Sequence, residues 1–203
     1  MSKNIKKGDF RTLGASAHSL EEREVAWFCK NQISMSDKKI LDACCGSRMF
    51  YFDKQDERVL FTDIREHEER VVDVGTSGTK GRKPIVVKPD IVSDFRNMNF
   101  KDNSFYHIVF DPPHFYKGAG ETGKIAFQYG LLKETWREDL KKGFSECFRV
   151  LRPNGTLIFK WCESEIPLKE ILKLTNNKPL YGHRSGKKAQ TIWVSFVKSD
   201  TTE

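Results

Sequence analysis

Short apolar runs that end near an aspartate recur through the first half of the chain. Residues 39–42 and 58–63 each finish on an aspartate, residues 90–95 carry one next to last, and Asp111 follows the run over residues 106–110. Apolar runs of this length are typical of parallel strands buried on both faces. Because the carboxyl ends of parallel strands meet at one edge of a sheet, we expect these four acids to share that edge.

The second half of the chain continues the alternation of strands and helices. The other predicted elements are helices over residues 19–31, 132–149 and 167–174, and strands over residues 156–161, 179–183 and 191–197. This order predicts an α/β fold with a mostly parallel sheet. A basic turn over residues 184–188 joins the last two predicted strands.

Residues 65–90 interrupt this alternation. They begin with a charged stretch over residues 65–70 and continue into a basic, glycine-containing stretch over residues 75–84. We interpret the region as a solvated connector that takes the place of a helix. A mobile cationic loop that grips phosphate groups is the alternative.

Composition limits the class of protein. With 203 residues and 38% hydrophobic residues, the chain is large enough for one core and one domain. No apolar run approaches the length of a membrane span, and residues 1–7 lack the apolar segment of a secretory signal. The five cysteines form no Cys-x-x-Cys pair, which predicts reduced thiols in the cytoplasm and no metal site. A net charge of +7 fits a polyanionic partner.

The most distinctive motif is Asp111-Pro112-Pro113-His114. Each proline favours an extended residue before it and removes one backbone N–H donor. What remains is a carboxylate and a row of carbonyl acceptors beside an aromatic ring whose charge can vary with pH. Such a site suits a flat ring that carries an amino group. The Asp111 carboxylate and the Pro112 carbonyl accept its two hydrogens, and His114 stacks on the ring face.

Two earlier strand ends indicate a nucleoside-containing ligand. After Asp42 the chain turns at a single glycine, Gly46, which argues against the glycine-rich turn that binds the pyrophosphate of a dinucleotide. Asp63, at the end of the second strand, stands where an acid commonly accepts ribose hydroxyl groups. A carboxylate has two acceptor oxygens and can therefore bind a vicinal diol.

The tetrad resembles the Asp-Pro-Pro-aromatic motif of the S-adenosylmethionine-dependent amino-methyltransferases, from which His114 departs because the fourth residue is usually Tyr, Phe or Trp. Residues 36–198 also resemble class I methyltransferases in the order of their elements and in the Leu-Arg-Pro-Asn-Gly turn before the strand over residues 156–161. The resemblance implies a Rossmann-like, mostly parallel seven-stranded sheet with a C-terminal antiparallel hairpin. It also implies S-adenosyl-L-methionine as cofactor. The whole chain, 1–203, is expected to form one domain, with a leading segment and helix over 1–35 and the catalytic sheet over 36–203.

The resemblance assigns a role to each matching position. Asp42 is expected near the methionine amino group, Asp63 at the ribose, Asp94 at the adenine amine and Phe95 against the adenine ring. The expected cofactor-binding residues are Asp42, Ala43, Cys44, Gly46, Asp63, Ile64, Asp94 and Phe95; the catalytic residues are Asp111, Pro112, Pro113 and His114. Phe115, Tyr116, Lys160 and Trp161 are expected to bind the substrate.

The expected substrate is the exocyclic amine of a nucleic-acid base, with adenine N6 in DNA favoured over RNA. Aromatic residues alternate with lysines over residues 115–135, a pattern that suits a splayed nucleotide. Cytosine N4, an amine in tRNA or rRNA, a glutamine amide on a protein, and a catalytically inactive nucleic-acid-binding homologue remain alternatives.

Overall fold

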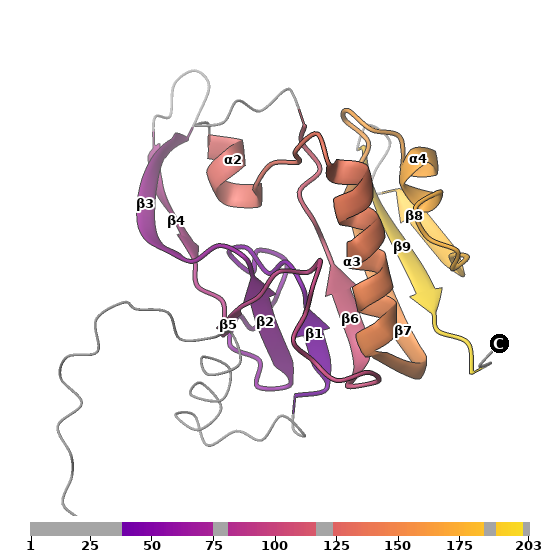
Figure 1. The fold of residues 1–203 in the computed structure, drawn as a ribbon. Helices are drawn as coiled ribbons and strands as arrows, with labels where there is room; N and C mark the ends of the chain where they lie inside the picture. Colours follow the sequence, from indigo (N-terminus) through magenta and orange to yellow (C-terminus); the bar gives the residue numbers. More distant parts are fainter. Residues whose placement is uncertain (1–37, 75–80, 117–123, 185–189, 201–203) are drawn as a thin grey trace, which may run out of the picture.

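A seven-stranded sheet forms the centre of the molecule (Figure 1). The computed structural model describes residues 38–74, 81–116, 124–184 and 190–200. Across the sheet, the strands are β5 (Ile91–Val92), β2 (Val59–Asp63), β1 (Ile40–Asp42), β6 (Phe105–Phe110), β7 (Leu151–Cys162), β9 (Thr191–Val197) and β8 (Tyr181–Arg184). The first five of these run parallel, and β9 is antiparallel to both of its neighbours. The predicted α/β fold with a closing antiparallel hairpin is confirmed.

The strand order reverses direction between β1 and β6. From β1 the chain builds outward to β2 and β5, and then returns to add β6 on the other side of β1. Asp42 lies beside Val109 in this pair, so the end of β1 and the residues that follow β6 are neighbours. In open α/β sheets, ligands bind at such a switch point, outside the carboxyl ends of the strands.

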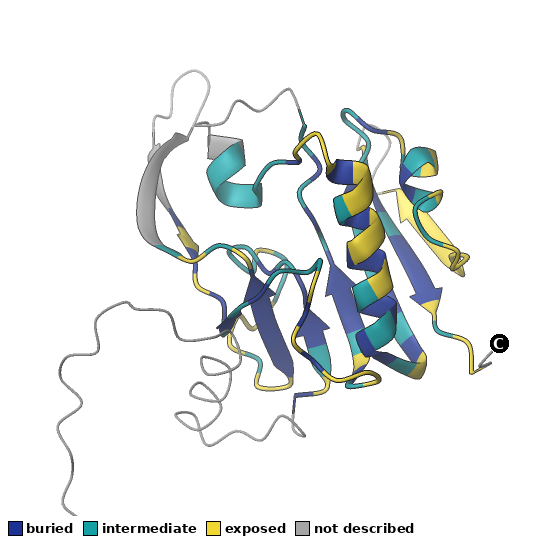
Figure 2. Cartoon of the chain, in the orientation of Figure 1, coloured by how far each residue is buried: buried dark blue, intermediate teal, exposed yellow. Residues whose placement is uncertain are grey.

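The apolar runs of the sequence form the core. All five positions of β2 are buried, and Figure 2 shows the central strands largely buried while α3 (Trp136–Val150) exposes one side. The α3 helix packs closely on the sheet at Gly143, where an added Cβ would lie 2.7 Å from both Phe110 Cζ and Phe95 Cδ2. The absence of a side chain at Gly143 therefore sets the distance between α3 and these two rings.

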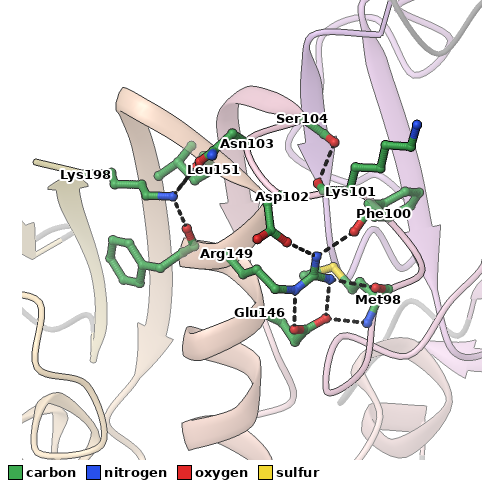
Figure 3. A network of polar contacts seen from close by, with 11 residues as sticks. Met98, Phe100, Lys101, Asp102, Asn103, Ser104, Glu146, Arg149, Leu151 and Lys198 are labelled. Carbon is green, nitrogen blue, oxygen red and sulfur yellow. Dashed lines mark hydrogen bonds and ion pairs between the residues drawn. The ribbon is translucent and has the colours of Figure 1, made fainter. Parts of the chain in front are cut away.

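A polar network fixes the carboxyl end of α3 to the turn that precedes β6 (Figure 3). The Arg149 guanidinium donates to the Met98 and Phe100 carbonyls at 2.8 and 2.6 Å. It also pairs with the Glu146 and Asp102 carboxylates at 2.7 and 2.8 Å. Because β6 leads directly to Asp111, this network anchors the strand that carries the tetrad.

Lys198 extends the network from the chain's last described segment. Its ammonium donates to the Phe148 and Leu151 carbonyls, at the end of α3, at 2.7 and 2.6 Å. A third bond, of 2.8 Å, reaches the Asn103 side chain. A cation at this position satisfies carbonyls that have no partner within the helix.

Residues 65–90, which we expected to be a solvated connector, contain regular strands. Two antiparallel strands, β3 (His67–Val74) and β4 (Gly81–Val87), form a separate hairpin there. Charged residues at the start of the region and glycines in the sequence between the two strands obscured the valine-rich stretches that favour strand formation. As expected, no helix occupies this interval within the residues that the structure describes.

The observed bounds of several other elements differ from the predicted bounds by a few residues. The helix predicted from residue 132 begins at Trp136, and a short additional helix, α2 (Lys124–Tyr129), lies in the segment expected to be a loop. The third predicted strand is reduced to β5, and the helix predicted over 167–174 is α4 (Leu168–Leu172). The helix expected over 19–31 lies outside the described residues. Within those residues, no helix combines the length and apolarity needed to cross a membrane.

Candidate functional site

A cavity of about 520 Å³ opens at the carboxyl ends of β1, β2 and β6. The predicted site residues that line it are Ala43, Cys44, Gly46, Asp63, Ile64, Phe95, Asp111, Pro113, His114, Phe115 and Lys160. These side chains come from positions up to 117 residues apart in the chain (43 to 160). The strand order brings them together at the switch point of the sheet.

The turn after β1 forms the floor of the cavity. Asp42 is wholly buried and does not line the cavity; its Oδ1 accepts the Cys44 N–H at 3.1 Å and so shapes the turn. Burial raises the pKa of Asp42 to about 7, although the Cys44 N–H and the Tyr51 hydroxyl act in the opposite direction. Gly46 has φ +49, a conformation that a residue with a Cβ rarely adopts.

Asp63 lies on the cavity wall with both carboxylate oxygens engaged. Oδ1 accepts the Arg65 backbone N–H and Nε–H, each at 2.9 Å. Oδ2 accepts the Gly46 N–H and an Arg65 guanidinium N–H, also at 2.9 Å. The side chain of Asp63 is only 4% exposed, so in this conformation Arg65 occupies the acceptors that the sequence analysis assigned to ribose.

Asp111 reaches the cavity from the end of β6. Its Oδ2 accepts a hydrogen bond from the Lys160 ammonium at 2.6 Å, and the two side chains are 12% and 18% exposed. Burial raises the pKa of Asp111, while the charge and the hydrogen bond of Lys160 lower it. Asp111 is thus a half-buried carboxylate with a cationic partner, at the end of the strand that precedes the tetrad.

His114 presents a neutral ring to the cavity. It is buried among aromatic side chains, with ring centroids 4.4 Å from Phe115 and 5.8 Å from Tyr129. Burial, reinforced by the Lys160 charge, lowers the pKa of His114 to about 4. The charge of His114 therefore changes only in acid, and at neutral pH the uncharged ring offers a stacking surface.

The α2 helix covers the cavity. The Phe127 carbonyl accepts an Arg65 N–H at 3.2 Å, and the Gln128 amide contacts the Met49 sulfur at 2.6 Å. After the helix, Gly130 has φ +76, and a Cβ there would lie 3.0 Å from Pro113 Cγ. Glycine at this position thus allows the chain to cross directly over the tetrad.

Several lining residues were not among the assigned site residues. They are Cys45, Ser47, Met49, Phe50, Arg65, Gln128, Tyr129, Gly130, Leu131 and Thr191. The aromatic and glycine-containing stretch from 115 to 135 did indicate that this segment borders the substrate, but its helix was not predicted. Phe50 and Thr191 carried no signal, because only the tertiary fold brings them to the switch point.

Trp161 is a core residue. It is wholly buried, its indole N–H donates to the Ile166 carbonyl at 2.8 Å, and it does not line the cavity. Successive side chains of a strand point to opposite faces, so Lys160 and Trp161 cannot both face the same cavity. The expectation that both contact substrate is corrected for Trp161.

Three other predicted residues also lie outside the cavity lining. The Asp94 carboxylate accepts three hydrogen bonds from the Arg96 guanidinium, the shortest of 2.6 Å, and its Oδ1 also accepts the Arg96 backbone N–H. The Tyr116 N–H donates to Glu165 at 3.0 Å, and Pro112 is buried. Phe95, next to Asp94, does reach the cavity and packs edge-on against Phe110.

A second cavity, of about 640 Å³, lies on the other side of the Gly46–Ser47 turn. Its Arg48 guanidinium is engaged with the Lys54 and Lys88 carbonyls and with Asp90. Gly46 is the one predicted site residue along its described lining. We therefore assign the candidate site to the cavity that contains Asp111.

The order β5-β2-β1-β6-β7-β9-β8, with β9 antiparallel, defines the Rossmann-like sheet of the class I methyltransferase fold. No protein-family model matches the sequence, and no curated protein matches it. Among solved structures, a Pyrococcus horikoshii protein is 15% identical with a TM-score of 0.48, covering 89% of each chain. A SAM-dependent methyltransferase of Methanosarcina mazei is 15% identical with a TM-score of 0.49, covering 85% of this chain and 97% of its own.

A third solved structure is the 1,6-didemethyltoxoflavin-N1-methyltransferase of Burkholderia thailandensis, with bound 1,6-didemethyltoxoflavin and S-adenosylhomocysteine. It is 15% identical with a TM-score of 0.43, and the match covers 93% of this chain and 94% of that one.

Proposed function

We propose that the protein is an S-adenosylmethionine-dependent methyltransferase that acts on the exocyclic amine of a nucleic-acid base. The observation that carries this proposal is the position of the Asp111 carboxylate. It stands at the switch point of a class I methyltransferase sheet, inside a cavity with aromatic walls. The carboxylate is an acceptor, as an amino group requires, and the neutral His114 ring provides a surface for a planar base.

The cavity suits the proposed cofactor in size and in most of its lining. A volume of about 520 Å³ lies within the range of small-molecule sites. The turn at Gly46 allows close approach, and the Phe95 ring offers an apolar surface for adenine. We assign the ribose diol to Asp63, whose acceptors become available only when Arg65 moves away.

The chemistry assigned to the chain is positioning and proton acceptance. When bound, S-adenosylmethionine supplies a methyl carbon whose bond to sulfur breaks, with its electron pair left on sulfur, as the amine lone pair forms the new bond. Asp111 Oδ1 accepts an amine hydrogen, which localises the lone pair on nitrogen, and it then takes up the proton that the methylated nitrogen releases. Positioning of this kind can lower a barrier by about 7–11 kcal/mol in favourable cases.

Adenine N6 in DNA is the favoured substrate, on the basis of the tetrad's resemblance. The net charge of +7 supports a nucleic-acid partner. In a duplex, the base must leave the stack to reach a carboxylate inside a cavity, at a cost of a few kcal/mol. Cytosine N4, an amine in RNA and a glutamine amide present the same donor and remain alternatives.

A second candidate is a nucleic-acid-binding homologue without catalytic activity. One observation favours it: Arg65 and Gly46 together make four hydrogen bonds to the Asp63 carboxylate. If this arrangement persists in solution, the ribose site is closed. Cofactor affinity separates the two candidates directly.

The test is methyl transfer from radiolabelled S-adenosylmethionine to duplex DNA, single-stranded DNA, total RNA and a protein extract. The proposal predicts label in one nucleic-acid fraction and, after digestion, a methylamino nucleoside identified by mass. Label in protein alone would favour the glutamine amide. A chain that neither binds the cofactor nor transfers label would support the inactive homologue.

A further inference from the structure

The contact between Asp111 and Lys160 limits what the cavity can accept. Asp111 Oδ2 is already bonded to the Lys160 ammonium at 2.6 Å. Oδ1 accepts no hydrogen bond from the part of the chain that the structure describes, and both side chains line the cavity. A ligand in the cavity therefore meets one acceptor oxygen on Asp111, with a cationic donor beside it.

The Lys160 ammonium is held from several sides. Trp193 lies opposite Lys160 in the β7–β9 pair, and the ammonium nitrogen is 5.8 Å from the Trp193 ring centroid. The Phe50 ring centroid lies 5.7 Å from the same nitrogen, at right angles to the Trp193 ring. Aromatic rings at this distance stabilise a cation. The carboxylate accepts a hydrogen bond from one of the three ammonium N–H groups, which leaves two N–H donors for a ligand.

We propose that Lys160 determines substrate specificity by donating a hydrogen bond to an acceptor atom adjacent to the amine that Asp111 binds. This inference rests on the proposed function, because it concerns the substrate of the same cavity. The substrate class is a planar ring whose amino group stands next to a ring nitrogen. Adenine, with N6 beside N1, and cytosine, with N4 beside N3, both present this edge.

Lys160 acts as a positioning residue in this account. A donor on the ring nitrogen withdraws electrons from the amine, so Lys160 does not make the amine a better nucleophile. Its contribution is to orient the base, because its hydrogen bond to the ring nitrogen lies beside the one that Asp111 accepts from the amine. Loss of Lys160 should therefore raise KM for the natural base more than it lowers kcat.

The test compares each natural base with an analogue that lacks the adjacent acceptor. Single-stranded oligonucleotides carry one adenine or one 1-deazaadenine, and a second pair carries cytosine or 3-deazacytosine. Methyl transfer gives kcat and KM, and fluorescence anisotropy gives binding without cofactor. The variants are Lys160→Met, Lys160→Arg and Lys141→Met; the last removes the same charge from the exposed side of α3 and controls for net charge.

The wild type and Lys141→Met should prefer the natural base over its deaza analogue by about tenfold or more, the loss expected for one charged hydrogen bond. Lys160→Met should lose that preference, and Lys160→Arg should retain part of it. The proposal would be overturned if Lys160→Met kept the preference for the natural base, which includes the case in which it binds the natural base and the deaza analogue more weakly by the same factor.

Two outcomes need a separate control. If the wild type labels neither base, the proposed function fails and this inference falls with it. If circular dichroism shows that Lys160→Met is unfolded, the double variant Asp111→Asn/Lys160→Met is used in its place, because it removes both charges of the pair. Its anisotropy must then show no preference between base and analogue; a persisting preference contradicts the role of Lys160.

Discussion

The guanidinium of Arg65 lies against the carboxylate of Asp63, with Nε 2.9 Å from Oδ1 and a terminal nitrogen 2.9 Å from Oδ2. Arg65 also donates to the Phe127 carbonyl at 3.2 Å and so links the end of β2 to α2, which covers the cavity. If the cofactor binds through Asp63, as we propose, this ion pair must open.

Removing the Arg65 side chain should strengthen cofactor binding. In Arg65→Ala the Asp63 oxygens no longer have a competing donor, and we expect the affinity for S-adenosylmethionine to rise about tenfold, as measured by titration calorimetry. The matched control is Arg58→Ala, which breaks an exposed Arg58–Asp56 pair away from the cavity and should leave the affinity unchanged. Weaker binding in Arg65→Ala would show instead that Arg65 helps to hold the cofactor.

Replacement of His114 should remove part of the protein's sensitivity to acid. The pKa of His114 falls from 6.5 to about 4 on folding, so the unfolded chain binds the proton more readily. Stability linked to this residue is complete above pH 6.5 and is lost as the pH falls toward 4. Between pH 7 and pH 5 the loss is about 2 kcal/mol.

The measurement for His114 is the free energy of unfolding by urea at pH 7 and pH 5, for wild type and His114→Phe. We expect the wild type to lose more stability than the variant over this interval. The comparison with the variant cancels the opposite contribution of Asp42, whose pKa is raised to about 7. Equal losses in both proteins would mean that His114 is not held neutral by burial.

Arg149 should contribute to stability more than an ordinary surface arginine. In Arg149→Met, the Met98 and Phe100 carbonyls and the Glu146 carboxylate lose a shared donor, and we expect a destabilisation of about 2 kcal/mol by urea denaturation. Lys141→Met, on the same helix but exposed, should change stability by less than about 0.5 kcal/mol. If the two variants unfold alike, the network in Figure 3 adds little to stability.

The fold was largely predictable because hydrophobic pattern determines buried parallel strands. The runs that end at Asp42, Asp63 and Asp111 became β1, β2 and β6, and the closing hairpin formed as expected. The hairpin of β3 and β4 was missed, since its stability comes from pairing that a charged, glycine-containing sequence does not reveal.

The site was predictable where a residue's position depends on the backbone alone. Asp63 and Asp111 line the cavity as their places at strand ends predict, whereas Asp42, Asp94 and Pro112 lie outside its lining. The side-chain partners of the two lining carboxylates, Arg65 and Lys160, were not predictable. Their contacts depend on side-chain rotamers and on the pairing register of the strands, which the sequence does not reveal. Trp161 was misplaced because the sequence analysis gave neighbouring strand residues the same face.

The most direct test of the central claim is the turnover of Asp111→Asn, with cofactor affinity measured on the same protein. Asparagine keeps the shape of the side chain but lacks the carboxylate charge and offers one acceptor oxygen in place of two. We predict S-adenosylmethionine binding within about twofold of wild type and a fall in methyl transfer to nucleic acid of at least about 100-fold. Methyl transfer by Asp111→Asn at the wild-type rate would contradict the account.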